Sequence, residues 1–388
     1  MGSRLDAVVL GAGIAGASAA KALADHGWET LLIDRKSFPR HKVCGEFLSP
    51  ESQGILHSLG LKETLDSLRP SLMGSVSLFS RNGQTLEVPL PGTAYGISRY
   101  ALDAALQLEA CKAGVQLHTE ETVTAVIPYG DRYRIETSRG GAQHTYEARV
   151  VIAAWGAQQN AKLQKPSVAN RDGVIYFGVK SHFTGAEQRP AVELYLFPGG
   201  YVGISSIEDH AINVAALLEQ SAFQGAGRSI LHILEAAARS HPALSARLAN
   251  AIPAAGTQVA VAPVDLERRA APWEQFPHIG DAVVHIPPLC GDGMSMALYS
   301  AQLCSALANR YLRGDISLSQ WQLSYCKQIE QQFKGPLRWG RMLQRLIHSP
   351  AMPDMLLSLG RLAPTLANRM VQATRLRGES FIQDNSRS

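Results

Sequence analysis

A glycine-rich hexapeptide near the N-terminus is the most specific chemical signal in the sequence. Gly11, Gly13 and Gly16 have the GxGxxG spacing, and Asp34 follows Gly16 by 18 residues. Between a strand and a helix, such glycines allow a tight turn, a close backbone approach to a pyrophosphate, and close helix–strand packing. The helix N-terminus then favours the phosphates, and the acid binds ribose hydroxyls. We therefore predict a site for FAD or NAD, formed by Gly11, Ala12, Gly13, Ile14, Ala15, Gly16, Asp34 and Arg35.

A second group of motifs lies far along the chain and favours FAD. Residues 150–157 read VVIAAWGA, and residues 278–297 read HIGDAVVHIPPLCGDGMSMA. The second string contains a Gly-Asp pair, then two prolines, then a glycine-flanked turn that opens a helix. Together with the N-terminal fingerprint, these strings resemble the FAD-dependent aromatic hydroxylase and geranylgeranyl reductase superfamily over almost the whole chain.

The resemblance implies how the later motifs meet the cofactor. In that superfamily the late Gly-Asp pair, here Gly280 and Asp281, places a carboxylate on the ribityl or ribose chain of FAD. The helix that follows approaches the flavin ring with its N-terminus, which stabilises the negative charge of reduced flavin. Arg99 matches a polar FAD contact and Val123 a backbone contact to adenine. Besides the fingerprint, we expect non-covalent FAD to contact Lys42, Cys44, Gly45, Arg99, Val123, Gly280, Asp281, Gly291, Gly293 and Met294.

The stretch PRHKVCGE, residues 39–46, selects a branch within that superfamily. Its PxxKxCGE pattern, followed by LSP, resembles the geranylgeranyl reductases and their bacterial relatives, as does the later string CGDGMSMA. The resemblance implies that Cys44 and Gly45 lie beside the flavin and that Glu46 contacts the substrate. Three roles are open for Cys44: a proton donor, a substrate contact, or a small polarizable residue that lines the cavity. Lys42 either holds an FAD phosphate or is solvated.

An aromatic hairpin supplies the candidate substrate surface. The sequence YLFPGGYVG, which begins at Tyr195, resembles the YxFPxxxY-type segment of the same branch. We expect Phe197 and Tyr201 to face the cavity, with Pro288 nearby, and to hold a large apolar, aromatic or unsaturated substrate. The alternative is ordinary packing within the hairpin. Tyr195 is a candidate proton donor and His285 a candidate proton relay, although a lone histidine is more often structural.

Three flavin chemistries compete for this sequence. The leading expectation is an NAD(P)H-driven monooxygenase that hydroxylates or epoxidises a large apolar metabolite; a single GxGxxG fits an electron donor that docks transiently. The alternative is a flavin-dependent alkene reductase of the geranylgeranyl reductase type, which needs a hydride from the flavin and a proton from Cys44 or Tyr195. A halogenase should carry a WxWxIP motif and an essential lysine, and we find neither. A non-redox flavin-binding protein is the remaining class.

These residues require a βαβ unit, followed later by a second sheet. Residues 6–10 predict an apolar strand, residues 14–26 a helix ended by Gly27, and ETLLI a second strand. An Asn-Gly pair near residue 82 predicts a β-hairpin. The fold class is α/β: a Rossmann-type FAD-binding domain with a parallel sheet, an inserted mixed β-sheet substrate domain and a C-terminal helical region. The expected ranges are 1–70, 95–165 and 270–315 for the FAD-binding domain, 71–94 and 166–269 for the substrate domain, and 316–388 for the helical region.

Composition excludes several classes of protein. Of the 388 residues, 46% are apolar and 18% are charged, as in globular proteins. No apolar run approaches the roughly 18 residues that a membrane span needs. The five cysteines are scattered without a CxxC pair, which fits a reducing cytoplasm and excludes a disulfide framework or an obvious metal site. A net charge of +4 does not by itself indicate nucleic acid.

The positive charge is concentrated in the C-terminal region. Residues 334–377 carry eight Lys or Arg against one acid. Arg338, Arg341 and Arg345 share one helical face and apolar residues another, so this region could cap the cavity, touch an anionic membrane, or meet an acidic carrier protein. The alternative is that the apolar stripe packs on the body of a cytoplasmic protein while the arginines are solvated. The stripe comprises Leu337, Met342, Leu343, Leu346, Ile347, Met355, Leu356, Leu359, Leu362, Leu366 and Met370.

Overall fold

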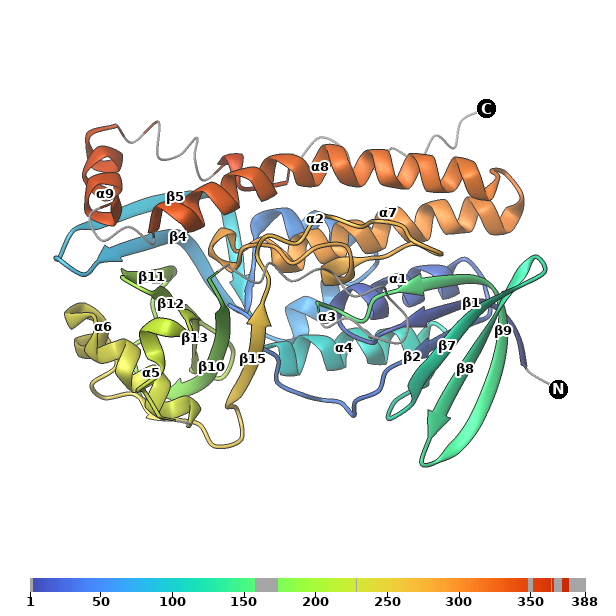
Figure 1. Ribbon diagram of the computed structural model, residues 1–388, viewed down its shortest axis with the longest axis horizontal. Coiled ribbons are helices and arrows are strands. Elements are labelled where there is room, and N and C mark those ends of the chain that lie inside the picture. Colours follow the sequence, from blue (N-terminus) through green and yellow to red (C-terminus); the bar gives the residue numbers. More distant parts are fainter. Residues whose placement is uncertain are drawn as a thin grey trace.

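Two β-sheets lie side by side in the computed structural model, and helices cover both of them (Figure 1). The structure describes residues 3–157, 174–227, 229–347, 352–363, 365 and 372–376. Within these ranges, no helix is both long enough and apolar enough to cross a membrane.

The first sheet has the N-terminal strand near its centre. Its strands are β1 (Ser3–Leu10), β2 (Thr30–Ile33), β6 (Gln116–His118), β7 (Thr122–Tyr129), β8 (Arg132–Arg139) and β9 (Ala142–Ala153). Their order is β6-β2-β1-β9-β8-β7, in which β6, β2, β1 and β9 are parallel. Val8 and Val9 point to opposite faces of β1 and are both fully buried, as in parallel sheets covered by helices.

Small residues let three helices pack closely beside this sheet. They are α1 (Ile14–Asp25), α4 (Arg99–Lys112) and α7 (Gly293–Arg313), and α1 contacts both of the others. Ala17, Ala19 and Ala20 of α1 are fully buried. The predicted βαβ unit is therefore confirmed. Two shorter helices, α2 (Pro50–Ser58) and α3 (Lys62–Ser67), follow in the chain.

The second sheet is mixed, and two helices cover its outer face. Its strands are β3 (Phe47–Leu48), β4 (Ser71–Ser80), β5 (Thr85–Gly96), β10 (Tyr176–Thr184), β11 (Ala191–Phe197), β12 (Gly200–Ser206), β13 (Ile212–Glu219), β14 (Ile252–Pro253) and β15 (Val259–Val264). The order is β14-β10-β13-β12-β11-β4-β5-β3, and β15 pairs with β10. The Asn82-Gly83 turn joins β4 to β5, which confirms the predicted hairpin. Residues of this sheet pack against α5 (Ile230–Arg239) and α6 (Pro242–Arg247).

Two C-terminal helices complete the described chain. In Figure 1, α8 (Leu318–Ile347) runs along α7 and reaches over both sheets, and α9 (Met352–Leu362) packs beside β4 and β5. A parallel sheet with helices, a second mixed sheet and a C-terminal helical region together confirm the predicted fold class.

The segment before Gly280 is not a regular strand. It forms two isolated bridges, a parallel one between Ala153 and His278 and an antiparallel one between Trp273 and Pro277. Pro272 and Pro277 interrupt the segment, and proline has no backbone N–H to donate to a neighbouring strand.

Candidate functional site

Two connected cavities lie at the carboxyl ends of β1, β2 and β9, where open α/β sheets bind their ligands. The larger has a volume of about 570 Å³ and the smaller about 140 Å³. They are continuous, because both are lined by Lys42, Val43, Gly156, Asp281 and His285.

Most of the residues that the sequence predicts as cofactor contacts line these cavities. Those in the larger cavity are Gly11, Asp34, Arg35 and Val123. Those in the smaller cavity are Gly13, Ile14, Ala15, Cys44, Gly45, Arg99, Gly280, Gly291, Gly293 and Met294. Ala12 lies in the turn and Gly16 at the start of α1, and neither lines a cavity.

The glycine fingerprint is required by the packing around it. A Cβ added at Gly11 would lie 2.4 Å from the Ala154 carbonyl oxygen, and one at Gly16 would lie 1.8 Å from the Gly11 carbonyl oxygen. Gly13 precedes α1, whose first turn has no side-chain cap and no acidic residue. The backbone also holds Asp34, whose carboxylate accepts from the amides of Ala12 at 2.8 Å and Lys36 at 2.9 Å.

The second helix end at the smaller cavity is the start of α7. Gly291 has a φ of +71°, and a Cβ there would lie 3.0 Å from the Phe47 ring, so glycine is needed. Asp292, the residue immediately before α7, is buried. Burial raises the pKa of its carboxyl to about 7, although Arg375, which lies 3.6 Å away, opposes this shift. Arg375 belongs to the basic C-terminal region and is itself buried.

Charged and polar groups line the junction between the two cavities. Lys42 Nζ lies 3.4 Å from an Asp281 carboxylate oxygen. Burial would raise the pKa of Asp281, but Lys42, His285 and Arg99 outweigh it and lower the pKa. Burial lowers the pKa of His285, and its Nδ1 is buried without a hydrogen-bond partner in the described structure.

These features fit FAD. The N-termini of α1 and α7 lie at the cavities, and Asp34 lies at the end of β2. At the junction of the cavities, His285 Nδ1 is buried and has no hydrogen-bond partner among the described residues. Helix N-termini attract phosphate and the negative charge of reduced flavin. Asp34 and Val123 would lie at the adenosine end, and Gly291, Gly293 and Met294 at the flavin end.

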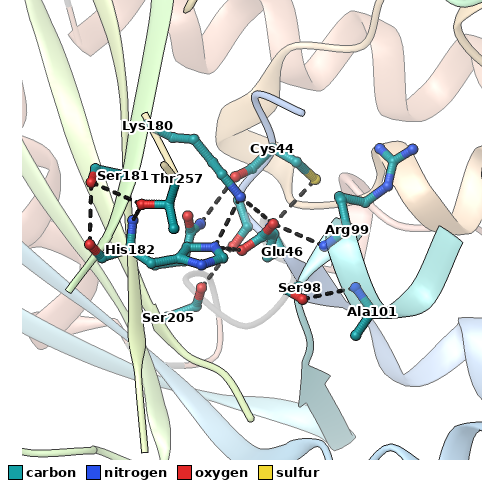
Figure 2. Close-up of polar contacts among 12 residues, drawn as sticks. Cys44, Glu46, Ser98, Arg99, Ala101, Lys180, Ser181, His182, Ser205 and Thr257 are labelled. Carbon is teal, nitrogen blue, oxygen red and sulfur yellow. Dashed lines mark hydrogen bonds and ion pairs between the residues drawn. The ribbon is translucent and has the colours of Figure 1, made fainter. Parts of the chain in front are cut away.

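Glu46 lies at the wall of the smaller cavity within a network of buried polar side chains (Figure 2). Its carboxylate accepts from the Arg99 amide at the start of α4, at 2.9 Å. The same carboxylate pairs with Lys180 and, at 2.6 Å, with His182 Nε2. Burial would raise the pKa of Glu46, but His182 and Lys180 outweigh it and lower the pKa. The Glu46 amide donates to Cys44 Sγ at 3.3 Å.

Sequence reasoning missed Lys180 and His182. Both lie on β10, two residues apart, and therefore on the same face of the strand. A signal was present, because two ionisable residues in alternation interrupt the otherwise apolar string YFGVKSHF. The sequence analysis did not single out Lys180, which pairs with Glu46 at the wall of the smaller cavity.

The aromatic hairpin does not line either cavity. Tyr195 and Phe197 face α5 and α6, in the core on the outer side of the sheet. The Tyr195 hydroxyl donates to the Glu193 carboxylate at 2.6 Å, and its ring stacks on Phe79 at 4.7 Å. Neighbouring residues of a strand point to opposite faces of the sheet. Tyr195 points to the face covered by α5 and α6, and it is therefore separated from Cys44 and His285, which line the cavities. Tyr201 lies on the inner face, buried near Leu289, and Pro288 lines the smaller cavity.

Several arginines of the C-terminal region bind the body of the protein. Arg341 donates to the Leu266 and Arg268 carbonyls, Arg361 to Gln84 and Thr85, and Arg375 to Glu51. The alternative that Arg338, Arg341 and Arg345 are solvated is therefore wrong for Arg341. The side chains of Ile347, Leu366 and Met370 lie outside what the structure describes. The most exposed members of the apolar stripe are Met342, Met355, Leu359 and Leu362.

Two solved structures share this architecture. A geranylgeranyl bacteriochlorophyll reductase-like protein from Thermoplasma acidophilum superposes with a TM-score of 0.74, at 19% identity over 92% of this chain and 91% of that one. The myxobacterial chondrochloren halogenase CndH gives a TM-score of 0.76, at 21% identity over 88% of this chain and 82% of that one. At such low identities these likenesses concern the fold alone.

Sequence comparison identifies the family. The pyridine nucleotide-disulphide oxidoreductase profile matches residues 5–205, and the chain belongs to that family. Among curated relatives, digeranylgeranylglycerophospholipid reductase 1 of Methanothermobacter thermautotrophicus is 27% identical over 321 residues, 79% of this chain and 78% of the relative. Menaquinone reductase of Mycolicibacterium smegmatis is 33% identical over 122 residues, 30% of this chain and 29% of the relative. The protein is an FAD-dependent oxidoreductase that resembles the geranylgeranyl reductase branch.

Proposed function

We propose that this protein reduces carbon–carbon double bonds of a large, apolar, prenyl-type substrate. The observation that carries the proposal is Cys44, whose thiol lies at the wall of the smaller cavity beside the start of α7. The curated relatives whose matches extend over most of this chain support it, because their names describe reductases of geranylgeranyl lipids. The sequence alone favoured a monooxygenase, but none of these relatives is named as one.

Bound FAD would supply the hydride, taken first from an electron donor such as NAD(P)H. The start of α7 would stabilise negative charge at the reduced flavin ring. Cys44 would give a proton to the substrate carbon that does not receive the hydride. The amide of Glu46, which donates to Cys44 Sγ, would stabilise the thiolate that remains.

Neighbouring contacts fix the position of Cys44. Asn213 Nδ2 donates to the Cys44 carbonyl at 3.0 Å, and the Ser205 hydroxyl donates to the Gly45 carbonyl at 2.7 Å. Both partners lie on strands of the second sheet, so the sheet holds the loop against the cavity. A thiol in a fixed position transfers its proton without first reordering the loop.

The test is anaerobic reoxidation of the reduced enzyme by digeranylgeranylglycerophospholipid in detergent micelles. The flavin should reoxidise when the alkene lipid is added, and Cys44→Ala should slow the step about 100-fold, as expected for loss of a general acid. Cys111→Ala is the matched control, because Cys111 is exposed at the end of α4. Reoxidation that requires oxygen would reject the proposal in favour of a monooxygenase.

We further propose that the lipid-like substrate reaches the cavity from a membrane surface. Trp339 and Met342 of α8, the helix that also carries Arg338, expose apolar side chains, as do Leu359 and Leu362 of α9. Apolar side chains beside positive charge are typical of helices that bind anionic membranes.

A further inference from the structure

Three ionisable side chains form a closed ring behind the smaller cavity. Lys180 Nζ contacts Glu46 Oε1, His182 Nε2 lies 2.6 Å from Glu46 Oε2, and Lys180 Nζ lies 3.0 Å from His182 Nε2. Lys180 and Glu46 are 0% exposed. Figure 2 shows Lys180 and His182 reaching from β10 towards Glu46, which lies beside Cys44 and the start of α4.

Stability alone does not account for such a ring. Replacing a buried ion pair with apolar residues of similar size is often neutral or stabilising, because desolvation of the charges offsets their attraction. Glu46 also has a φ of +53°, which is unfavourable for a residue with a Cβ and is often found at functional sites. Groups with perturbed protonation beside a cavity are candidates for catalysis.

The ring contains one proton whose position is not fixed. At 2.6 Å, His182 Nε2 and Glu46 Oε2 need a hydrogen between them. That hydrogen is bonded either to Nε2, which then donates to the carboxylate, or to Oε2, which then donates to Nε2; in neither case does Nε2 keep a lone pair that could accept from the Lys180 ammonium. The ring therefore has alternative arrangements that differ in the position of a proton.

A further histidine connects the ring with the larger cavity. The His41 ring lies 5.0 Å from the His182 ring, edge to face, and stacks on Tyr100 at 4.8 Å. His41 lines the larger cavity, and its Nδ1 is buried without a hydrogen-bond partner in the described structure. Burial, Lys180 and His182 lower the pKa of His41, against the opposing effect of Glu46, and this favours its neutral form.

We propose that the Lys180–Glu46–His182 ring stores the proton that each reduction consumes and passes it to Cys44; this rests on the proposed function. In one turnover reduced FAD, when bound, would supply a hydride to one carbon of the double bond, and Cys44 would give its proton to the other. The double bond would become a single bond, the flavin would be left oxidised, and Cys44 would be left as a thiolate. The ring then reprotonates the thiolate and regains its own proton from solvent through His41.

Other charges that face the ring do not replace it. The Arg99 guanidinium is paired with Asp103 at 2.8 Å, and only its backbone amide contacts Glu46. The aromatic ring of Tyr100 stacks on the imidazole of His41, which lies between it and the Lys180–Glu46–His182 ring. Ser181 and Thr257, which hydrogen-bond each other behind His182, carry hydroxyl groups that do not ionise near neutral pH.

The first test needs no substrate. In the FAD-loaded enzyme, the slope of the flavin midpoint potential against pH gives the number of protons taken up per two electrons. Reduced flavin is negatively charged, and a nearby negative charge favours the protonated form of the ring. We expect wild-type protein to take up more protons than Lys180→Met and His182→Asn between about pH 5 and 8, where imidazoles titrate. Glu193→Gln, which alters a buried ionic cluster on β11 away from the cavities, should keep the wild-type slope.

The second test measures anaerobic single turnover with digeranylgeranylglycerophospholipid. Lys180→Met and His182→Asn should each slow it about 100-fold, the loss expected for an acid–base group, with FAD still bound. If one variant fails to fold, the other carries the test. Wild-type turnover together with unchanged slopes and rates in the variants would overturn the proton store and leave the reductase intact. Absence of turnover in wild-type protein, with altered slopes in the variants, would reject the reductase and the proton transfer to Cys44, and would leave only proton uptake by the ring on reduction of the flavin.

Discussion

Replacing Asp34 with alanine tests whether the end of β2 binds the ribose of FAD. The substitution removes a carboxylate that lies at the wall of the larger cavity and is 8% exposed. A hydrogen bond to a charged group contributes about 1.5 to 3 kcal/mol, which corresponds to roughly 10- to 150-fold in the dissociation constant. Asp34 also accepts from the Ala12 amide at 2.8 Å, so its loss loosens the glycine turn and adds to the effect.

Fluorescence titration of apo-protein with FAD measures this change directly. The matched control is Asp25→Ala, at the end of α1, where an exposed carboxylate pairs only with Lys21. An exposed ion pair contributes about 0 to 1 kcal/mol to stability and should not affect FAD affinity. If Asp34→Ala bound FAD as tightly as Asp25→Ala, the assignment of Asp34 to the ribose would be refuted.

Three further predictions address packing, pH and the membrane. Gly16→Ala should abolish FAD binding or folding, because its Cβ would lie 1.8 Å from the Gly11 carbonyl oxygen; yellow soluble protein would contradict this. The pKa of Asp292 rises from 3.8 to about 7 on folding, so its contribution to stability is complete below about pH 4 and is lost as the pH rises to 7. Asp292→Asn should remove that part of the pH dependence of thermal unfolding, and parallel curves for both proteins would refute the assignment. The protein should co-sediment with anionic but not neutral liposomes at low salt, and Leu362→Glu should weaken binding; equal binding to both lipids would exclude charge-dependent docking.

The cofactor end of the site could be predicted because its signals are local. Gly11, Gly13 and Gly16 are fixed by one strand–turn–helix unit, and Gly291 and Gly293 by one helix start. A Cβ at Gly11, Gly16 or Gly291 would meet atoms within a few residues of the motif or in its immediate packing partner. Such local signals can be recognised without knowledge of the rest of the fold.

The proton-handling residues could not be predicted in the same way. Glu46 and Lys180 are 134 residues apart in the sequence, and they meet through the assembly of the second sheet, in which β3 follows Glu46 and β10 carries Lys180. Tyr195 was predicted to lie at the site and does not. The alternation of apolar residues identifies a strand, but it does not show which face of the strand meets the cavity. The basic C-terminal region likewise gave no indication that Arg375 would be buried beside Asp292.

Analysis of the product of one turnover tests the central claim most directly. FAD-loaded enzyme is reduced under strict exclusion of oxygen, mixed with digeranylgeranylglycerophospholipid, and quenched before the lipid is examined by mass spectrometry. A reductase adds two hydrogens to a double bond for each flavin oxidised, and oxygen should not be needed. A lipid that stays unchanged until oxygen is admitted, and then gains an oxygen atom, would contradict the account.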